Sequence, residues 1–197
     1  MNISDSIQNI HFPKNATALN KARQRFKFEE LFYIQLSILR QSKWREQNFS
    51  GFIFEKVGDS FNSFYNDYLP FTLTEAQKRV IREIRIDTGS GKQMNRLLQG
   101  DVGSGKTVVA LLTMLMGIET GLQSALMAPT EILANQHFNG ITELAKELNI
   151  TIKILTGSTK TAERKIIHEA LENGTLDILI GTHALLEDKV QFQNLGL

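Results

Sequence analysis

The residues best suited to do chemistry in this chain form one glycine-rich run, GDVGSGKT, from Gly100 to Thr107. The run follows the pattern G-x-x-x-x-G-K-[ST], which is typical of a loop that holds phosphate groups. Its glycines allow positive φ, so that backbone N–H groups can close around phosphate oxygens. Lys106 would bring a cation to the β- and γ-phosphates, and the Thr107 hydroxyl would be a ligand for Mg²⁺. The expected cofactor contacts are Gly100, Asp101, Val102, Gly103, Ser104, Gly105, Lys106 and Thr107, and the expected catalytic groups among them are Lys106 and Thr107. The run therefore predicts a site for ATP and Mg²⁺.

Regular elements on both sides of this loop are expected to position it. The apolar pair Leu97–Leu98 precedes the loop and predicts a short strand, and a helical pattern follows from Lys106 to about Glu119. Further along, apolar runs at 124–128, 151–155 and 177–180 alternate with amphipathic stretches at 131–148 and 161–172. Such alternation predicts right-handed βαβ units, and hence an α/β fold with a mostly parallel sheet and helices on both faces.

The segment from Phe71 to Gln77 allows two interpretations. Thr74 and Gln77 have the spacing of a capping box, so a helix is expected to begin there and Phe71 could pack beneath it. The side-chain amide of Gln77 can also donate and accept, so it could read the edge of adenine while Phe71 lies against the base. In the second interpretation Phe71, Thr74 and Gln77 all belong to the nucleotide site.

The aromatic residues divide the chain into two regions, because almost all of them lie before Phe71. Helical spacing predicts one helix between Ala16 and Trp44 and another that ends before Pro70. Aromatic stripes at helical spacing more often serve packing than base stacking. We therefore expect a mainly helical linker over residues 1–70 and a nucleotide-binding lobe over residues 71–197.

The composition limits the possible functions. The net charge is +1 without a basic cluster, so charge gives no support for nucleic-acid binding, which must be argued from motifs. The chain has no cysteine, which excludes disulfides and thiolate metal sites and suits a reducing compartment. It lacks a signal-peptide pattern and any apolar run long enough for a membrane helix. We expect a cytoplasmic protein without a membrane partner.

Several motifs fit one family when they are taken together. They are LPFTLTEAQ at 69–77, LLQGDVGSGKT at 97–107, MAPTEILANQH at 127–137, LTGS at 155–158, IGTHALL at 180–186, IHFP at 10–13 and FEELF at 28–32. In combination they resemble the RecG-type branch-migration DNA helicases of superfamily 2, over nearly the whole chain. The loop itself is generic and is shared in this form with the transcription-repair coupling translocase. The IHFP and FEELF segments are what favour the RecG type.

The resemblance implies an ATP-dependent DNA helicase that couples ATP hydrolysis to the remodelling of forked or branched DNA in recombination and repair. It implies that Gln77 reads adenine and that Lys106 and Thr107 hold the triphosphate and Mg²⁺. It also implies contacts with DNA backbone phosphates from three pairs of residues, namely Pro129 and Thr130, Gly157 and Ser158, and Gly181 and Thr182. Without the resemblance, the last two pairs would be interpreted as ordinary turns at strand ends.

The resemblance also predicts what lies outside this sequence. In the family, a strand after Leu195–Leu197 ends in an acidic pair that binds Mg²⁺, a second lobe supplies arginines, and a wedge domain comes first. We therefore expect a fragment with an incomplete RecA-like lobe that forms the phosphate cradle but does not turn over ATP. Its open sheet edge could cause self-association. Two alternatives remain open, namely a nucleotide-dependent binding module without motor activity and another P-loop enzyme such as a small-molecule kinase.

Overall fold

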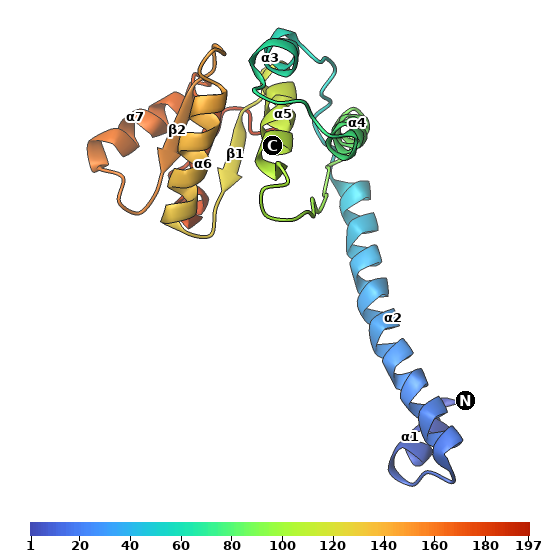
Figure 1. Cartoon of the computed structure of the whole chain (residues 1–197). Coiled ribbons are helices and arrows are strands. Elements are labelled where there is room, and N and C mark those ends of the chain that lie inside the picture. The colour runs from blue at the N-terminus through green and yellow to red at the C-terminus, as the bar shows by residue number, and fades with distance from the viewer. The chain divides into compact units, whose positions relative to one another are not determined.

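The computed structural model describes all 197 residues, and it divides the chain into two compact units, Met1–Ser50 and Gly51–Leu197 (Figure 1). The first unit contains α1 (Ile3–His11) and α2 (Ala16–Asn48), which begin at N-caps whose side chains accept from backbone N–H groups. The helix predicted from Ala16 to Trp44 is thus confirmed and continues for another turn. None of the helices in the chain combines the length and apolarity that a membrane span requires.

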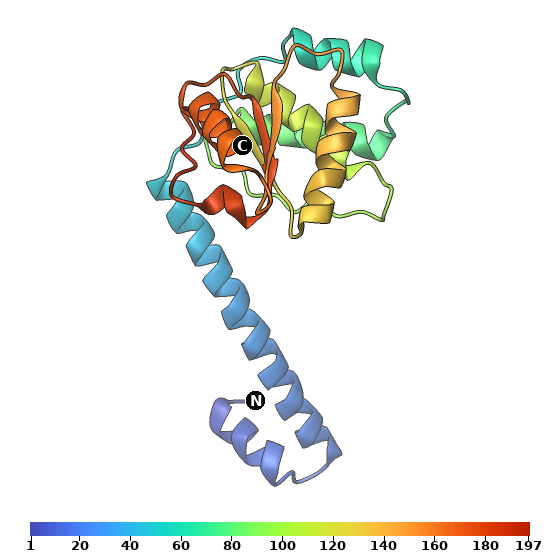
Figure 2. The ribbon, with the colours of Figure 1, turned by 90° about the vertical axis from the view of Figure 1, so that its left-hand side faces the viewer.

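The second unit is built on a parallel sheet with strand order β1-β3-β2. Its strands are β1 (Ser124–Met127), β2 (Ile152–Leu155) and β3 (Ile178–Gly181). The chain passes from β1 over β3 to β2 through α6 (Glu131–Leu144), and it returns to β3 through α7 (Thr161–Glu172). Because these crossovers run in opposite directions, right-handed connections place α6 and α7 on opposite faces, as Figure 2 shows.

The central strand β3 is buried on both faces, and its side chains alternate between two apolar clusters. Ile178 and Ile180 face the cluster that contains Ile141 of α6. Leu179 faces the cluster that contains Ile167 of α7. The predicted α/β architecture, with helices on both faces of a parallel sheet, is therefore confirmed.

One predicted strand is absent, because the segment around Leu97–Leu98 pairs with no other strand. The last residues of the chain instead pair with the edge of β1 that faces away from β3. Gln123 and Leu195 form a parallel bridge there, and the N–H of Ala125 donates to the carbonyl of Leu197 at 2.8 Å. A strand cannot form without a paired edge, which explains why Leu97–Leu98 remains irregular.

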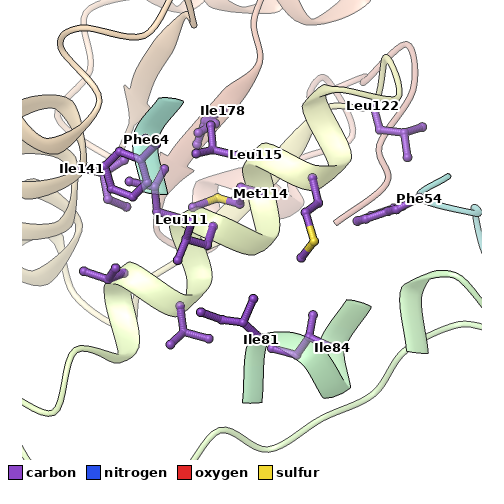
Figure 3. Close-up of a cluster of buried hydrophobic side chains, with 14 of the residues drawn as sticks. Phe54, Phe64, Ile81, Ile84, Leu111, Met114, Leu115, Leu122, Ile141 and Ile178 are labelled. Atoms are coloured by element: carbon purple, nitrogen blue, oxygen red, sulfur yellow. The ribbon is translucent and has the colours of Figure 1, made fainter. Parts of the chain in front are cut away.

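Helix α5 (Lys106–Ile118) is the core of the second unit, and nine of its residues are buried: Val108, Val109, Leu111, Leu112, Thr113, Met114, Leu115, Met116 and Gly117. Figure 3 shows it passing between Ile81 and Ile84 of α4 (Glu75–Thr88) and Ile178 of the sheet. A helix that is apolar on all sides must be surrounded by other elements. This packing fixes the position of Lys106, the first residue of α5, and with it the end of the glycine-rich loop.

The structure places the division between the two units twenty residues before the predicted boundary at Pro70. Gly51 already belongs to the second unit, because its N–H donates to the carbonyl of Gly91 at 2.8 Å. Phe54 and Phe64 are buried in the same cluster as α5. The change in aromatic content does not mark this division, because aromatic residues lie on both sides of Ser50.

The second aromatic helix is also less regular than its spacing predicts. It begins as the short helix α3 (Asp59–Ser63) and continues as a turn of π-helix, η1 (Phe64–Tyr68). The wider turn leaves Phe64 fully buried, whereas Tyr65 and Tyr68 are exposed. The aromatic stripe is therefore only partly used for packing.

The burial of Phe64 generates a test of this boundary. Phe64→Ala should lower the free energy of unfolding of the second unit by about 3 to 5 kcal/mol, because a fully buried ring is replaced by a cavity. Phe52→Ala, at a ring that is 50% exposed in the same segment, should cost less than about 1 kcal/mol. Urea unfolding of the two variants measures the difference, and equal costs would show that residues 51–70 do not share the core.

Candidate functional site

The glycine-rich loop ends at the N-terminus of α5 in a geometry suited to bind an anion. Gly103 and Gly105 have φ values of 79° and 78°, in a region that residues with a side chain rarely adopt. Gly105 is the N-cap of α5. The N–H groups of Lys106 and Thr107 have no partner inside the protein. Unpaired N–H groups and the helix dipole make such a terminus attractive to phosphate oxygens.

The side chains of the loop have internal partners of different kinds. Nζ of Lys106 donates to the carbonyl oxygens of Gly100 at 2.8 Å and of Asp101 at 2.7 Å. The Thr107 hydroxyl is half-buried and makes no hydrogen bond within the protein. The structure contains no group of three or more His, Asp or Glu side chains that could hold a metal ion alone. The unpaired Thr107 hydroxyl fits a magnesium ion that is held mainly by nucleotide phosphates.

Gln77 connects the start of α4 to the phosphate loop. Its Oε1 accepts from the N–H of Thr74 at 2.8 Å, and the Thr74 hydroxyl accepts from the N–H of Gln77, so the predicted capping box is present. Its Nε2 also donates to the carbonyl oxygen of Ser104 at 2.9 Å. An amide has two N–H donors and two acceptor lone pairs. Gln77 therefore keeps one donor and one acceptor position for a further ligand.

Phe71 lies in a different place from Gln77. Its ring is 47% exposed and lines a surface cleft of about 350 Å³ together with Tyr65, Leu73 and Lys78. Gln77 is not among the residues that line this cleft. The structure thus brings Gln77 to the phosphate loop and connects Thr74 to it through Gln77, but it does not place Phe71 in a common cleft with Gln77.

The residues expected on the DNA side lie at or just after the carboxyl ends of the three strands. Met127 and Leu155 are both in register with Gly181, so the three loops leave the sheet at one edge. The loop before α5 lies on the same side as the carboxyl end of β1 in Figure 1. In open parallel sheets, ligands bind at this edge.

Two of the three expected pairs are accessible at this edge. Pro129 and Thr130 are exposed, and the Thr130 hydroxyl caps α6 by accepting from the N–H of Leu133. Gly157 and Ser158 are also exposed. Gly181 and Thr182 are both buried, and the Thr182 side chain is only 4% exposed, so neither offers a side chain to a ligand in this arrangement.

Glu131 joins two of these loops, and sequence analysis assigned it no role. Its Oε1 accepts a hydrogen bond from the Thr156 hydroxyl at 2.9 Å and another from the Ser158 hydroxyl. These hydrogen bonds, that from Ser158 first, lower the pKa of the Glu131 carboxyl below its ordinary value. Its position next to Thr130 in the motif was the signal that could have identified it.

Comparison with known proteins agrees with this geometry. Residues 74–197 match the model of the DEAD/DEAH box helicase family. The whole chain is 46% identical to a protein named ATP-dependent DNA helicase RecG from Synechocystis sp., of which it covers 24%. It is 47% identical to the protein of the same name from Thermotoga maritima, of which it covers 25%.

A solved structure is similar as well. It is described as RecG bound to a three-way DNA junction, is 46% identical, and superposes with a TM-score of 0.86 over 97% of this chain and 26% of that one. The chain thus spans about a quarter of the length of the curated relatives it matches.

The first prediction from the site concerns Lys106. Lys106→Ala should abolish nucleotide binding, because the ammonium is the mobile cation that the loop offers to the terminal phosphates. Isothermal titration with ATP and Mg²⁺ measures the effect. Lys153→Ala, which removes an exposed cation without a partner in the structure, is the control and should bind as the wild type does. Equal affinities for Lys106→Ala and the wild type would refute the assignment of the loop.

The second prediction concerns Gln77. Gln77→Ala should narrow the preference for ATP over GTP, because the amide can pair with the edge of adenine whereas guanine presents the opposite pattern. It should also lower the free energy of unfolding by about 1 kcal/mol through loss of the capping box. Competition binding and urea unfolding separate the two effects, and Gln136→Ala, at an exposed position of α6, is the control. A wild-type chain without any preference for ATP would contradict base recognition by Gln77.

Proposed function

This chain belongs to the DEAD/DEAH box helicase family, and from that premise we propose that it forms the nucleotide-binding part, and part of the DNA-binding surface, of an ATP-dependent DNA helicase. The observation that carries the proposal is the position of the phosphate loop. The loop lies at the N-terminus of a buried helix, on the side of the sheet where the loops after β1, β2 and β3 emerge. Because the two sites share this side of the sheet, a change at the nucleotide could alter DNA binding, and DNA would then alter nucleotide affinity by the same factor.

The family uses ATP, and the residues that hold it here follow from the loop. Nζ of Lys106 would exchange the carbonyl oxygens of Gly100 and Asp101 for phosphate oxygens, which carry full negative charge and bind an ammonium more strongly. The N–H groups of Lys106 and Thr107 would donate to the phosphates. Mg²⁺, bound to the Thr107 hydroxyl and the phosphates, would neutralise charge during phosphoryl transfer.

Base recognition would use the part of Gln77 that the capping box leaves free. One N–H of Nε2 and one lone pair of Oε1 remain, which is the number that the edge of adenine requires. The bond from Nε2 to Ser104 would then connect recognition of the base to the conformation of the phosphate loop. Phe71 would reach the base only after a change in its cleft.

The DNA surface would consist of the exposed loops at the carboxyl edge. Pro129, Thr130, Gly157 and Ser158 would contact backbone phosphates, which position a protein on DNA without reading its sequence. Gly181 and Thr182 would take part through the shape of the edge, since they are buried. The named relatives and the junction-bound structure support forked or branched DNA as the substrate and remodelling of forks and junctions as the activity. Such work would take place in the cytoplasm.

Binding of forked DNA tests the proposal. Fluorescence anisotropy should detect binding of a labelled fork by the wild-type chain, with an affinity that falls as salt rises because phosphate contacts release counterions. A non-hydrolysable ATP analogue should change this affinity in the wild type and have no effect in Lys106→Ala, while the mutant keeps its nucleotide-free affinity. Absence of DNA binding by a chain that binds nucleotide would contradict the DNA part of the proposal and favour another P-loop enzyme.

A further inference from the structure

The turn after β2, Thr156–Thr159, is held from two sides by side chains of different helices. From α6, the Glu131 carboxylate accepts from the hydroxyls of Thr156 and Ser158. Within the turn, the N–H of Thr156 donates to the Thr159 hydroxyl at 2.9 Å and the N–H of Thr159 donates to the Thr156 carbonyl at 3.2 Å. Both ends of the turn are therefore fixed by hydrogen bonds.

From α7, Arg164 holds the backbone of the same turn. Its Nη2 donates to the Thr156 carbonyl at 2.7 Å, and its Nε donates to the Thr159 carbonyl at 3.2 Å. Its Nη1 forms an ion pair with Glu187 at 3.0 Å, in the segment that follows β3. One planar guanidinium thus joins the turn after β2 to the segment after β3, a geometry that a lysine cannot reproduce.

These contacts determine which donors of the turn remain available. A hydroxyl has a single proton, and that of Ser158 is directed to Glu131. The backbone N–H groups of Gly157 and Ser158, in contrast, have no partner inside the protein and belong to exposed residues. An incoming phosphate would therefore meet backbone N–H groups, whose direction depends on the conformation of the turn.

The charge of Glu131 opposes this contact. The carboxylate is ionised at neutral pH, as an ordinary glutamate is, and its hydrogen bonds to Thr156 and Ser158 hold it next to the place where a phosphate would bind. Repulsion between the two anions would weaken DNA binding, whereas ordering of the turn would strengthen it. A neutral side chain that still accepts hydrogen bonds would keep the turn ordered and would remove the repulsion of the phosphate.

We propose that Glu131 and Arg164 are positioning residues, which hold the Thr156–Thr159 turn so that the N–H groups of Gly157 and Ser158 are presented to the DNA backbone. The proposal rests on the DNA contact proposed above and adds to it the residues that set its geometry. It assigns the contact at Ser158 to the backbone N–H, while the Ser158 hydroxyl helps to hold the turn through Glu131.

The DNA-binding test compares four variants of the full chain on a labelled fork. Glu131→Ala and Arg164→Ala should weaken binding about tenfold, since each leaves the turn without one of its two supports. Glu131→Gln should bind as well as the wild type or up to about threefold more tightly, because it accepts hydrogen bonds without the charge. Arg164→Lys should remain weak, because an ammonium cannot hold the carbonyl oxygens of Thr156 and Thr159 together.

The controls remove a carboxylate or an ammonium group from exposed positions next to Arg164. Glu163 and Lys165 lie on either side of Arg164 on α7. The DNA affinities of Glu163→Ala and Lys165→Ala should stay within about twofold of the wild type. Wild-type affinity in Arg164→Lys would show that Arg164 contributes only its positive charge to DNA binding. That result would overturn its positioning role. A loss in Glu131→Gln equal to that in Glu131→Ala would overturn the role assigned to Glu131.

Amide hydrogen exchange tests the positioning without DNA. The Thr159 N–H, which closes the turn, should exchange at least about fivefold faster in Glu131→Ala and Arg164→Ala, and at the wild-type rate in Glu131→Gln and Glu163→Ala. Unchanged exchange in the alanine variants would overturn the positioning, whatever the DNA result. If exchange is faster in the alanine variants but the wild-type chain does not bind the fork, the positioning stands and the proposed DNA contact is wrong.

Discussion

The burial of α5 is the constraint on which the second unit depends. The helix is apolar on every side and lies between α4 and the sheet, so it cannot shift without opening the core on both sides (Figure 3). Its first residue is Lys106, and the glycines just before it supply the backbone conformations that a side chain would strain. A loop that must change partners when it binds phosphate is thus attached to the least movable element of the unit.

Several polar groups that would meet a ligand already have partners within the protein. Lys106 donates to loop carbonyls, Gln77 donates to Ser104, and the Ser158 hydroxyl donates to Glu131. Ligand binding would therefore exchange hydrogen bonds rather than add them, and the gain is greatest where a charged phosphate oxygen replaces a neutral carbonyl oxygen, as at Lys106. Unpaired backbone N–H groups at Lys106, Thr107, Gly157 and Ser158 have no such internal competition. These backbone groups would add to the binding free energy that the exchange at Lys106 supplies.

Sequence patterns predicted the features that depend on local rules. The capping box at Thr74 and Gln77, the helix that begins at Lys106 and the three parallel strands follow from short-range spacing and periodicity, and the structure contains all of them. Features that depend on contacts between distant segments were not predictable in this way. The strand at Leu97–Leu98 lacks an available edge to pair with, and an isolated apolar pair cannot reveal that.

The same limit applies to the site. Sequence analysis selected Ser158 for its place in a motif, but the partner that takes up its hydroxyl proton, Glu131, is far from it in the chain. Arg164 supports the turn through backbone carbonyls, which carry no sequence signal at all. The π-turn at Phe64–Tyr68 likewise changes which aromatic rings are buried without changing their spacing.

We propose that a loop held by α5 binds the phosphates of a nucleotide and is connected to the base through Gln77. Amide NMR of the isotopically labelled chain during a titration with ADP and Mg²⁺ distinguishes this arrangement from binding elsewhere. We expect the largest shift changes at the backbone amides from Gly103 to Thr107 and at the side-chain amide of Gln77, while the buried middle of α5 changes little. Saturable changes confined to other residues, or no changes at millimolar nucleotide, would contradict it.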